Sequence, residues 1–352
     1  MARVLGHRLF WPVAALLALV VLNAAVRPGF VRITVRDGHL YGALVDILRQ
    51  SAPLMMVALG MTLVIATRGI DLSVGAVMAV SGAVALTFID RSADPGALGT
   101  VLVAIAAGVA VGVVLGTWNG FLVTVFGVQP IVATLVLMLA GRGVALLITG
   151  GFITTVVSPP YKFVASGFLL GLPFALFLSA AAIAVVAIVQ RRTALGLLTE
   201  AVGINPEASR LAGVRSQGIV FTAYVASGAL AGLAGILYSS NIMAADANAA
   251  GEFIELYAIL AVVLGRTSLL GGKFSIAGTA VGVLIIQTLQ STVLFLGVSS
   301  AQSPVFFAFV VVVVVVVQSP QLHRRLSRLS GRRRGRTAPP AQPATRDLEV
   351  SA

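Results

Sequence analysis

Residues 98–126 read LGTVLVAIAAGVAVGVVLGTWNGFLVTVF, a run of 29 residues without one charged side chain. A helix needs about 20 predominantly apolar residues to cross the hydrocarbon core of a bilayer. This run exceeds that length, so it predicts a helix that spans a membrane. The fold class of the chain then follows from how often such runs recur.

Nine further apolar segments lie on both sides of this run. Together the ten occupy residues 10–26, 51–67, 74–89, 98–126, 131–149, 168–189, 218–239, 254–264, 274–296 and 304–317. Apolar residues make up 58% of the chain and charged residues 10%, against about 25% charged in ordinary soluble domains. These values exclude a soluble globular, a disordered or a fibrous protein. We therefore predict an all-α polytopic membrane protein of about ten transmembrane helices, with 254–264 and 304–317 short or broken.

Basic residues orient these helices, because Lys and Arg are enriched in cytoplasmic loops. With the N-terminus inside, 17 Lys and Arg residues fall in inner loops and termini and 6 in outer loops. Ten spans then place both termini in the cytoplasm. The expected organisation is a cytoplasmic N-terminus at 1–9, a transmembrane domain at 10–317 and a cytoplasmic tail at 318–352.

The tail holds eight arginines against Asp347 and Glu349, which is half of the chain's net charge of +12. We expect it to be disordered and to lie against the anionic lipids of the inner leaflet. The basic run at 332–334 would also suit nucleic acid, but the rest of the chain lies in lipid and basic runs recur beside spans. Membrane lipids are therefore the expected partner, and nucleic acid is not.

The start of the chain imitates a secretory signal peptide, with Arg3 and Arg8 ahead of an apolar run. The run reaches Val26 and its cleavage pattern is poor, so we predict an uncleaved first helix. Further along, residues 40–50 mix apolar and charged side chains. That mixture predicts a short amphipathic helix at the membrane interface.

Two stretches between apolar segments look alike, 64–75 (VIATRGIDLSVG) and 262–272 (VVLGRTSLLGG). Each has an Arg, a Leu four residues later and Gly soon after. Non-helical backbone at membrane depth is tolerated only where protein or a water-filled cavity covers it, so duplicated breaks point towards a transporter with a weak internal repeat. Ordinary turns between spans are the alternative. The residues that mark the two breaks are Arg68, Gly69, Asp71, Ser73, Gly75, Arg266, Gly271 and Gly272.

Signals for an enzyme are weak. Cysteine is absent, and the three histidines lie in predicted loops or ends without a cluster at metal-ligand spacing. The stretch 271–274 (GGKF) is not a phosphate-binding loop, because Thr267 stands at its first Gly position and Phe274 at its Ser or Thr position. We expect no catalytic residue, no metal site and no cofactor on this chain, so that any ATP is used by a partner subunit.

Ionisable side chains inside the predicted spans are few, although a carrier coupled to protons or ions usually needs one. Asp71, Arg142 and Glu255 are the candidates. Arg142 is the one placed well inside a segment. It either snorkels from a helix end or donates to hydroxyls or backbone carbonyls along a pathway.

Neutral polar side chains are more numerous in the spans. They offer both donors and acceptors, so they suit a polyhydroxylated solute better than an ion or a lipid. Hydrogen bonding between helices is the alternative, since Asn, Gln and Thr commonly do this in membranes. The candidates for the translocation path are Trp118, Asn119, Thr134, Arg142, Asn241, Gln287 and Gln290.

The inner loop at 190–217 is too long for a tight turn and carries helix signals of its own. Asn205 can cap a helix, Pro206 suits the first helical position, Glu207 favours a helix N-terminus and Gly213 fits a C-cap. We predict an exposed helix of about two turns, whose small side chains let another protein approach closely. An importer driven by a separate ATPase requires such a helix; an interfacial helix without a partner is the alternative. The predicted coupling residues are Asn205, Pro206, Glu207, Ala208, Ser209, Ala212 and Gly213.

Three blocks resemble the sugar-importing ABC permeases of the ribose, xylose and galactoside group. They are 61–76 (MTLVIATRGIDLSVGA), 201–214 (AVGINPEASRLAGV) and 258–274 (AILAVVLGRTSLLGGKF). The second falls where the family's coupling segment lies, and the similarity extends from about residue 41 to residue 318. Stretches such as 116–120 (GTWNG) and 245–251 (ADANAAG) are most similar to the galactofuranose permeases of the family.

The resemblance implies a permease subunit of the plasma (inner) membrane that imports a monosaccharide, either galactofuranose, a galactose-like sugar or another pentose or hexose. It also implies a partner ATP-binding subunit with two fused cassettes and an extracytoplasmic (periplasmic) sugar-binding protein. A second permease copy, or a related permease, would complete the pore. An ion-coupled secondary transporter of a small polar solute is the alternative that the residues leave open.

Arg68 and Arg266 depart from the family pattern, which has Gly at both positions. Both lie in the look-alike breaks, where they either face the ATPase or the inner gate or snorkel. The Arg-rich tail is not part of the shared core.

Overall fold

The computed structural model describes residues 9–297 and residues 305, 308 and 312. The chain divides into two units, 1–303 and 304–352, and the fold below is that of the first. Its helices are α2 (Phe10–Val26), α3 (Ala43–Ala66), α4 (Val74–Asp90), α5 (Leu98–Thr124), α6 (Pro130–Thr149), α7 (Pro159–Ser166), α8 (Phe174–Arg192), α9 (Ala194–Ile204), α10 (Pro206–Leu211), α11 (Ser216–Ile242), α12 (Ile254–Leu264) and α13 (Ile276–Phe295). Apart from the three single positions, the predicted span at 304–317 and the tail at 318–352 lie outside the described residues.

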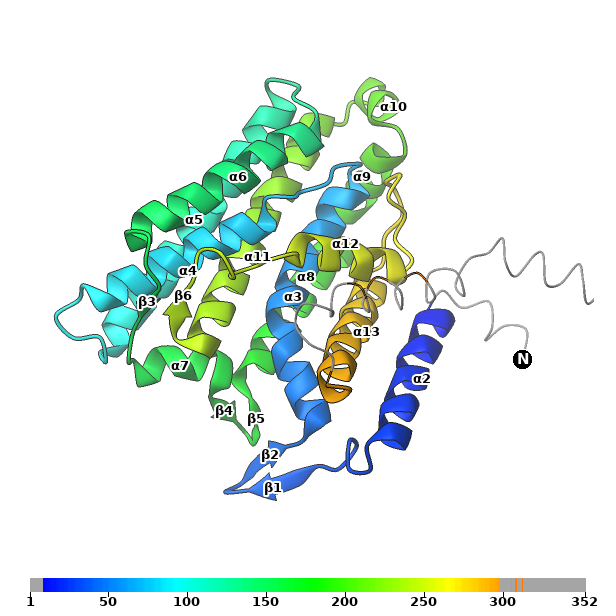
Figure 1. The fold of residues 1–352 in the computed structure, drawn as a ribbon. Coiled ribbons are helices and arrows are strands. Elements are labelled where there is room, and N and C mark those ends of the chain that lie inside the picture. The colour runs from blue at the N-terminus through cyan, green and yellow to red at the C-terminus, as the bar shows by residue number, and fades with distance from the viewer. Residues whose placement is uncertain (1–8, 298–304, 306–307, 309–311, 313–352) are drawn as a thin grey trace, which may run out of the picture. The chain divides into compact units, whose positions relative to one another are not determined.

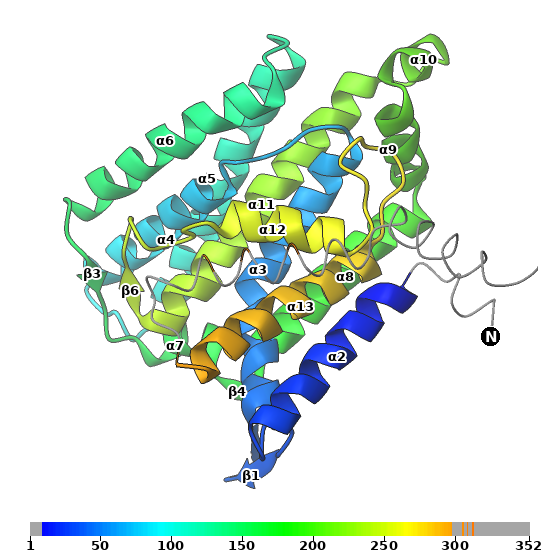
Figure 2. The same ribbon diagram turned by 45° about the vertical axis from the view of Figure 1, so that its right-hand side comes forward.

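Three short antiparallel strand pairs join the helices. They are β1 (Thr34–Arg36) with β2 (His39–Tyr41), β3 (Thr154–Thr155) with β6 (Ala244–Ala245), and β4 (Phe168–Leu169) with β5 (Leu172–Pro173). The three pairs and α7 lie at one end of the helical bundle, which we call the strand end (Figure 1). α9 and α10 lie at the opposite end, the coupling end (Figure 2).

The first helix runs between these two ends. Leu9, just before α2, lines a cavity at the coupling end together with Gln190 and Phe274. Beyond the last turn of α2, Phe30 packs edge-on against Phe295 at the end of α13, with ring centroids 5.9 Å apart. α2 and α13 therefore begin together at the coupling end and finish together at the strand end.

In the described part of the chain, α3, α5, α6, α8, α11 and α13 are long and apolar enough to cross a membrane. The chain is thus a mostly helical, polytopic membrane protein, as the segment pattern predicts. α4, with 17 residues, and α12, with 11, are shorter. Each follows a non-helical stretch, 67–73 and 246–253 respectively. Broken elements of this kind are tolerated in a membrane where protein surrounds them.

Glycines bring α5 and α11 into backbone contact. A Cβ added to Gly112 on α5 would lie 2.5 Å from the carbonyl oxygen of Gly228 on α11. One added to Gly228 would lie 2.6 Å from the Cα of Gly116. Close approach through small residues is how helices associate in lipid, where no hydrophobic effect drives them together. Because α11 also packs on α3 and α4, it supports the first break, which joins those two helices.

The two look-alike stretches fold in the same way at the ends of α3 and α12. Arg68 and Arg266 both adopt the left-handed conformation, with φ of 67° and 66°. At each, the amides of the Arg and of the next residue donate to carbonyls three and five positions earlier. This is the Schellman C-cap, whose left-handed residue is usually Gly. Because many helices end in this way, the internal repeat stays a prediction.

Two expectations about element boundaries are wrong. Residues 40–50 do not form a separate interfacial helix, because α3 runs unbroken from Ala43 to Ala66 and its first turns bury Val45 and Ile47. The apolar segment predicted at 168–189 starts six residues before the helix that the structure shows, α8, which begins at Phe174. The first residues of the segment form the β4–β5 pair, which turns through Gly171 at a φ of 81°, ahead of α8.

Candidate functional site

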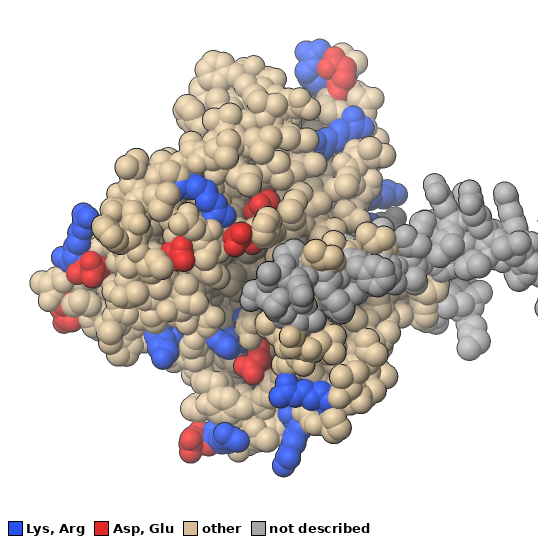
Figure 3. All heavy atoms as spheres, in the orientation of Figure 1, with Lys and Arg blue, Asp and Glu red and all other residues tan. Residues whose placement is uncertain are grey.

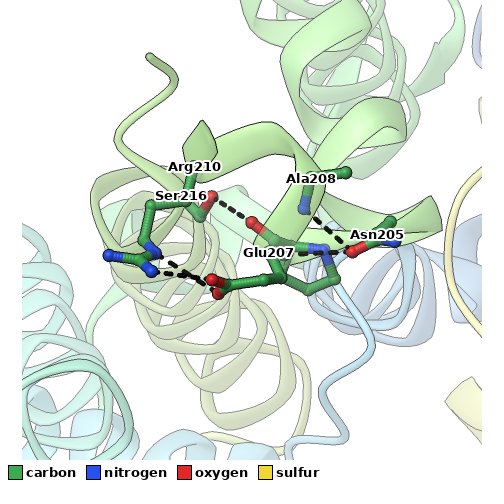
Figure 4. Close-up of polar contacts among 6 residues, drawn as sticks. Asn205, Glu207, Ala208, Arg210 and Ser216 are labelled. Atoms are coloured by element: carbon green, nitrogen blue, oxygen red, sulfur yellow. Dashed lines mark hydrogen bonds and ion pairs between the residues drawn. The ribbon is translucent and has the colours of Figure 1, made fainter. Parts of the chain in front are cut away.

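α10 is a short helix at the coupling end, and its N-terminus is capped as the sequence predicts (Figure 4). Asn205 Oδ1 accepts hydrogen bonds from the backbone N–H groups of Glu207 at 3.1 Å and Ala208 at 3.0 Å. Pro206 occupies the first helical position. Gly213, just past the last turn, has a φ of 87°, which favours Gly. The predicted short helix is therefore confirmed.

Two side-chain contacts hold α10 in shape. Arg210 lies 2.7 Å from the Glu207 carboxylate, and Ser216 Oγ donates to the Pro206 carbonyl at 2.9 Å. The hydrogen bond from Arg210, and then its charge, lower the pKa of the Glu207 carboxyl. An ionised acid–base pair is consequently displayed over α10, whereas charged side chains are sparse over most of this face (Figure 3). An exposed pair of this kind adds little stability.

The exposed surface of α10 differs from the predicted one at two residues. Leu211, which we did not predict, is exposed, and Ser209, which we did predict, is buried. Ser209 is buried, because its Oγ donates to the Asn205 carbonyl at 2.9 Å. Leu211 is 78% exposed. Single exposed apolar residues are common on protein surfaces, so this exposure alone does not mark a contact. The signal in the sequence was a single Leu inside a polar loop helix. Asn205, Glu207, Ala208, Ala212 and Gly213 are exposed and Pro206 is partly exposed.

Three backbones meet directly ahead of α10. Arg68 Nε donates to the Gly203 carbonyl at 2.7 Å, and its Nη2 donates to the Ile204 carbonyl. From the second break, the Gly272 N–H donates to the Ala66 carbonyl at 2.9 Å. A Cβ on Gly203 would lie 1.9 Å from that same oxygen. We call these five residues the break junction, because both breaks and the end of α9 meet there.

Side chains from several helices satisfy the polar groups of the first break. Asp71 Oδ1 accepts from Ser73 Oγ at 2.6 Å, and its Oδ2 accepts from Ser227 Oγ on α11 at 2.8 Å. Asn119 on α5 donates to Ser73 Oγ at 2.8 Å, and Thr134 on α6 donates to a backbone carbonyl of the break at 3.3 Å. All five side chains are buried. Asn119 therefore ties α5 to the break, whereas the Thr134 hydroxyl lies closer to the Pro130 carbonyl of its own helix, at 2.9 Å.

The N-termini of α4 and α12 meet inside the bundle. A Cβ added to Gly75 would lie 2.5 Å from the Gly251 carbonyl oxygen and 2.8 Å from Glu255 Oε2. Glu255 belongs to the first turn of α12 and is only 4% exposed. Because helix N-termini favour negative charge, this carboxylate lies where the positive ends of two half-helices come together. Facing ends of broken helices are typical of the central sites of transporters.

Arg142 on α6 holds the loop that leads into α12. Its Nη1 donates to the carbonyls of Ala247 at 2.8 Å, Asn248 at 2.9 Å and Ala250 at 2.8 Å. Asp246 stiffens the same loop by accepting from the Asn248 N–H at 2.9 Å. The guanidinium thus fixes the approach to the meeting point of the half-helices.

Three candidate path residues come together in a polar pocket of about 190 Å³ between α3, α11 and α13. They are Asn241, Gln287 and Gln290. Arg49 and Gln50 also line it, and Arg49 Nη1 donates to Asn241 Oδ1 at 2.6 Å. The sequence missed these two because it placed them in the interfacial helix. The pocket is smaller than the roughly 300 Å³ at the lower end of typical small-molecule sites.

Trp118 and Arg266 lie apart from these groups. Trp118 is 51% exposed on α5. Arg266 is exposed, and its side chain makes no hydrogen bond within the described part of the chain. The candidate path residues therefore fall into separate sets: those around the first break, those in the polar pocket, Arg142 at the loop, and Trp118 alone.

The chain is similar in sequence to known proteins over most of its length. Residues 43–316 match the family model described as branched-chain amino acid transport system / permease component. That range includes both breaks, α9 and α10. No solved structure shows a significant match.

Three relatives are similar over most of the chain. The fructose import permease protein FruF of Bifidobacterium longum is 42% identical over 94% of this chain and 93% of its own. The galactofuranose transporter permease protein YtfT of Escherichia coli is 44% identical, with 89% and 92% covered. The ribose import permease protein RbsC of Escherichia coli is 37% identical, with 87% and 92% covered.

Proposed function

We propose, from the premise that this chain belongs to the family of the branched-chain amino acid transport system / permease component, that it is the transmembrane permease subunit of an ATP-driven ABC importer for a monosaccharide. The relatives described above are named as permeases for fructose, galactofuranose and ribose. All three solutes are monosaccharides. The chain is accordingly a transport subunit of the plasma (inner) membrane and not an enzyme.

The observation that carries this proposal is the link between α10 and the two breaks. α10 is exposed, capped and charged, as a docking helix for another protein should be. Asn205, the N-cap of α10, comes directly after Ile204. The carbonyl of Ile204 accepts a hydrogen bond from Arg68 of the first break. A force applied to α10 thus has a short, hydrogen-bonded route to the centre of the bundle.

Membership of this family implies two kinds of partner, an ATP-binding subunit and a substrate-binding protein. In finer detail, we expect the ATP-binding subunit to carry two fused cassettes that bind at α10. The sugar-binding protein would dock at the strand end on the periplasmic or extracytoplasmic side. A second copy of this chain, or a related permease, would complete the pore. Lipids surround the assembly, and no nucleic acid takes part.

The orientation that fits these partners puts the coupling end in the cytoplasm. α2 begins at that end, which agrees with a cytoplasmic N-terminus. α13 finishes at the strand end. A tenth span at 304–317 would return the chain to the cytoplasm, where the basic tail at 318–352 meets anionic lipid. The permease domain then covers residues 10–317, with 190–217 as its coupling region.

The polar pocket and the meeting point of the half-helices are the two sites that we propose the sugar contacts as it crosses the membrane. Amide side chains at Asn241 and Gln287 exchange hydrogen bonds with hydroxyl groups in passing. A tight site is not needed, because capture is done by the binding protein. Galactofuranose, a galactose-like sugar or another pentose or hexose fits this chemistry equally well.

This chain transports the sugar by moving its helices, while the partner subunit hydrolyses the ATP. ATP binding closes the two cassettes of the partner, and that closure displaces α10. The displacement reaches the breaks through the break junction and separates α4 from α12, so that the pore opens to the cytoplasm. The chain itself binds no cofactor in this scheme.

The alternative is a secondary carrier coupled to an ion, which would need an acid such as Asp71 or Glu255 as its ion-binding group. The relatives favour the importer. In this structure Asp71 is hydrogen-bonded to Ser73 and Ser227, and Glu255 lies beside Gly75.

Dependence on ATP separates the two functions. Right-side-out membrane vesicles from the native host are loaded with ATP or left without it, and labelled D-fructose, D-ribose and D-galactose are supplied with the host's periplasmic extract. The proposal predicts accumulation of at least one sugar that requires internal ATP and persists with an ionophore. Accumulation without ATP that collapses with an ionophore would overturn it.

A further inference from the structure

We propose that Arg68 is the positioning residue that transmits movement of α10 to the first break, an inference that rests on the importer function proposed above. It goes beyond that function by naming the single side chain through which the partner's ATP cycle reaches the pore.

The contacts of Arg68 join two elements that are far apart in sequence. Its Nε donates to the Gly203 carbonyl at 2.7 Å and its Nη2 to the Ile204 carbonyl. These carbonyls belong to the last turn of α9, where helix carbonyls lack intrahelical donors and a cation is favoured. The planar guanidinium can reach both at once, which a Lys ammonium does less well.

Arg68 lies between the moving helix and the centre of the protein. Asn205, the N-cap of α10, follows Ile204 directly. On the other side, Gly69 is packed so closely that a Cβ there would lie 2.5 Å from the Tyr224 hydroxyl. Asp71, three residues after Arg68, is bonded to Ser227 of α11. The route from α10 to the buried break therefore contains no flexible segment longer than a few residues.

The backbone conformation at Arg68 allows a substitution that removes the side chain alone. With a φ of 67°, the position favours Gly. An Arg there is disfavoured by its backbone and is held by the two bonds to α9. A Gly at this position would keep the C-cap and lose the link.

Arg266 provides a control within the same chain. It has the same conformation, with a φ of 66°, at the corresponding position of the second break. Its side chain is exposed and makes no hydrogen bond within the described residues. Changing each Arg to Gly therefore removes one charge from equivalent caps, but only Arg68→Gly cuts a contact with α9.

A role in coupling differs from simple capping of α9 in what it changes. A structural cap affects ATP hydrolysis and uptake together, in proportion to the amount of folded complex. A transmitting residue lets hydrolysis continue while transport fails. The quantity to measure is the number of sugar molecules imported per ATP hydrolysed.

The experiment uses the tagged complex purified from the native host and reconstituted in liposomes, with the labelled sugar that wild-type vesicles accumulate. Arg68→Gly should leave assembly and basal ATPase activity unchanged and lower the sugar-to-ATP ratio about tenfold or more, within the range of ordinary coupling energies. Arg68→Lys should restore part of the ratio, and Arg266→Gly should stay close to wild type.

Hydrogen exchange of the same variants supplies a readout that needs no transport. Arg68→Gly should speed the exchange of amides in α9 and α10, because their tie to α3 is gone, and Arg266→Gly should not. Equal sugar-to-ATP ratios for the two Gly variants would overturn the inference, and faster exchange in Arg68→Gly alone would then mean that Arg68 only caps α9. Absence of ATP-driven uptake in the wild-type complex would instead overturn the proposed function.

Discussion

Gly75 on α4 and Gly251 ahead of α12 touch through their backbones. A Cβ on Gly75 would lie 2.5 Å from the Gly251 carbonyl oxygen, and a Cβ on Gly251 would lie 2.8 Å from the Gly75 carbonyl oxygen. Gly251 also has a φ of 66°, which favours Gly. The meeting point of the two half-helices thus depends on two glycines that are 176 positions apart in the sequence.

Substituting Gly75 by Ala should force the half-helices apart. The added methyl has backbone and the Glu255 carboxylate within 3 Å, so overpacking should cost about 1–3 kcal/mol. Thermal unfolding of the purified chain in detergent measures this. Gly143→Ala on α6 is the matched control, because no atom lies within 4 Å of its added Cβ. Equal midpoints for the two variants would contradict the contact.

The coupling helix gives a second prediction. Glu207→Arg with Gly213→Trp replaces the exposed ion pair by two positive charges and places a bulky residue at a φ of 87°. Binding of the ATPase should fail and uptake should be abolished, while membrane insertion is intact. Uptake of labelled sugar and the yield of the inserted chain check this in one set of cells. Normal uptake by the double variant would remove α10 from the coupling role.

Local signals account for what the sequence predicted well. The limits of α12 agree with the apolar run at 254–264, although it is too short for a full span. α10 was readable because an N-cap, a Pro and a Gly stand at fixed offsets within a few residues. Caps of this kind depend on neighbours along the chain, so no tertiary contact is needed to find them.

Long-range contacts account for what the sequence did not show. Nothing near Arg68 indicates that its side chain reaches α9, 135 positions away. The polar pocket was likewise incomplete, because Arg49 and Gln50 come from α3 and the amides from α11 and α13. Spacing along one helix identifies its polar face, but only packing decides which faces meet.

The polar pocket yields a third prediction. Asn241→Ala and Gln287→Ala remove amides that line it and should raise the apparent KM for sugar uptake by about fivefold, roughly 1 kcal/mol. Basal ATPase activity of the complex should not change. Gln129→Ala, an exposed amide at the N-cap of α6 and outside the coupling region, serves as the control. If all three variants transport alike, the pocket is not on the path.

The contact between α5 and α11 gives a fourth. Gly112→Ala should destabilise the chain by about 1–3 kcal/mol, because its methyl would meet the α11 backbone. Gly99→Ala, in the first turn of α5, has open space around its added Cβ and should not. Unfolding midpoints in the same detergent compare the two. A midpoint for Gly112→Ala equal to wild type would mean that the helices separate without loss.

Co-purification from the native host tests the central claim most directly. The tagged chain is extracted in mild detergent, the proteins bound to it are identified by mass spectrometry, and ATPase activity is measured. The account predicts a partner with two nucleotide-binding cassettes, ATPase activity in the complex, and loss of both when Glu207 and Gly213 are changed. A preparation of this chain alone that still transports sugar in liposomes without ATP would contradict it.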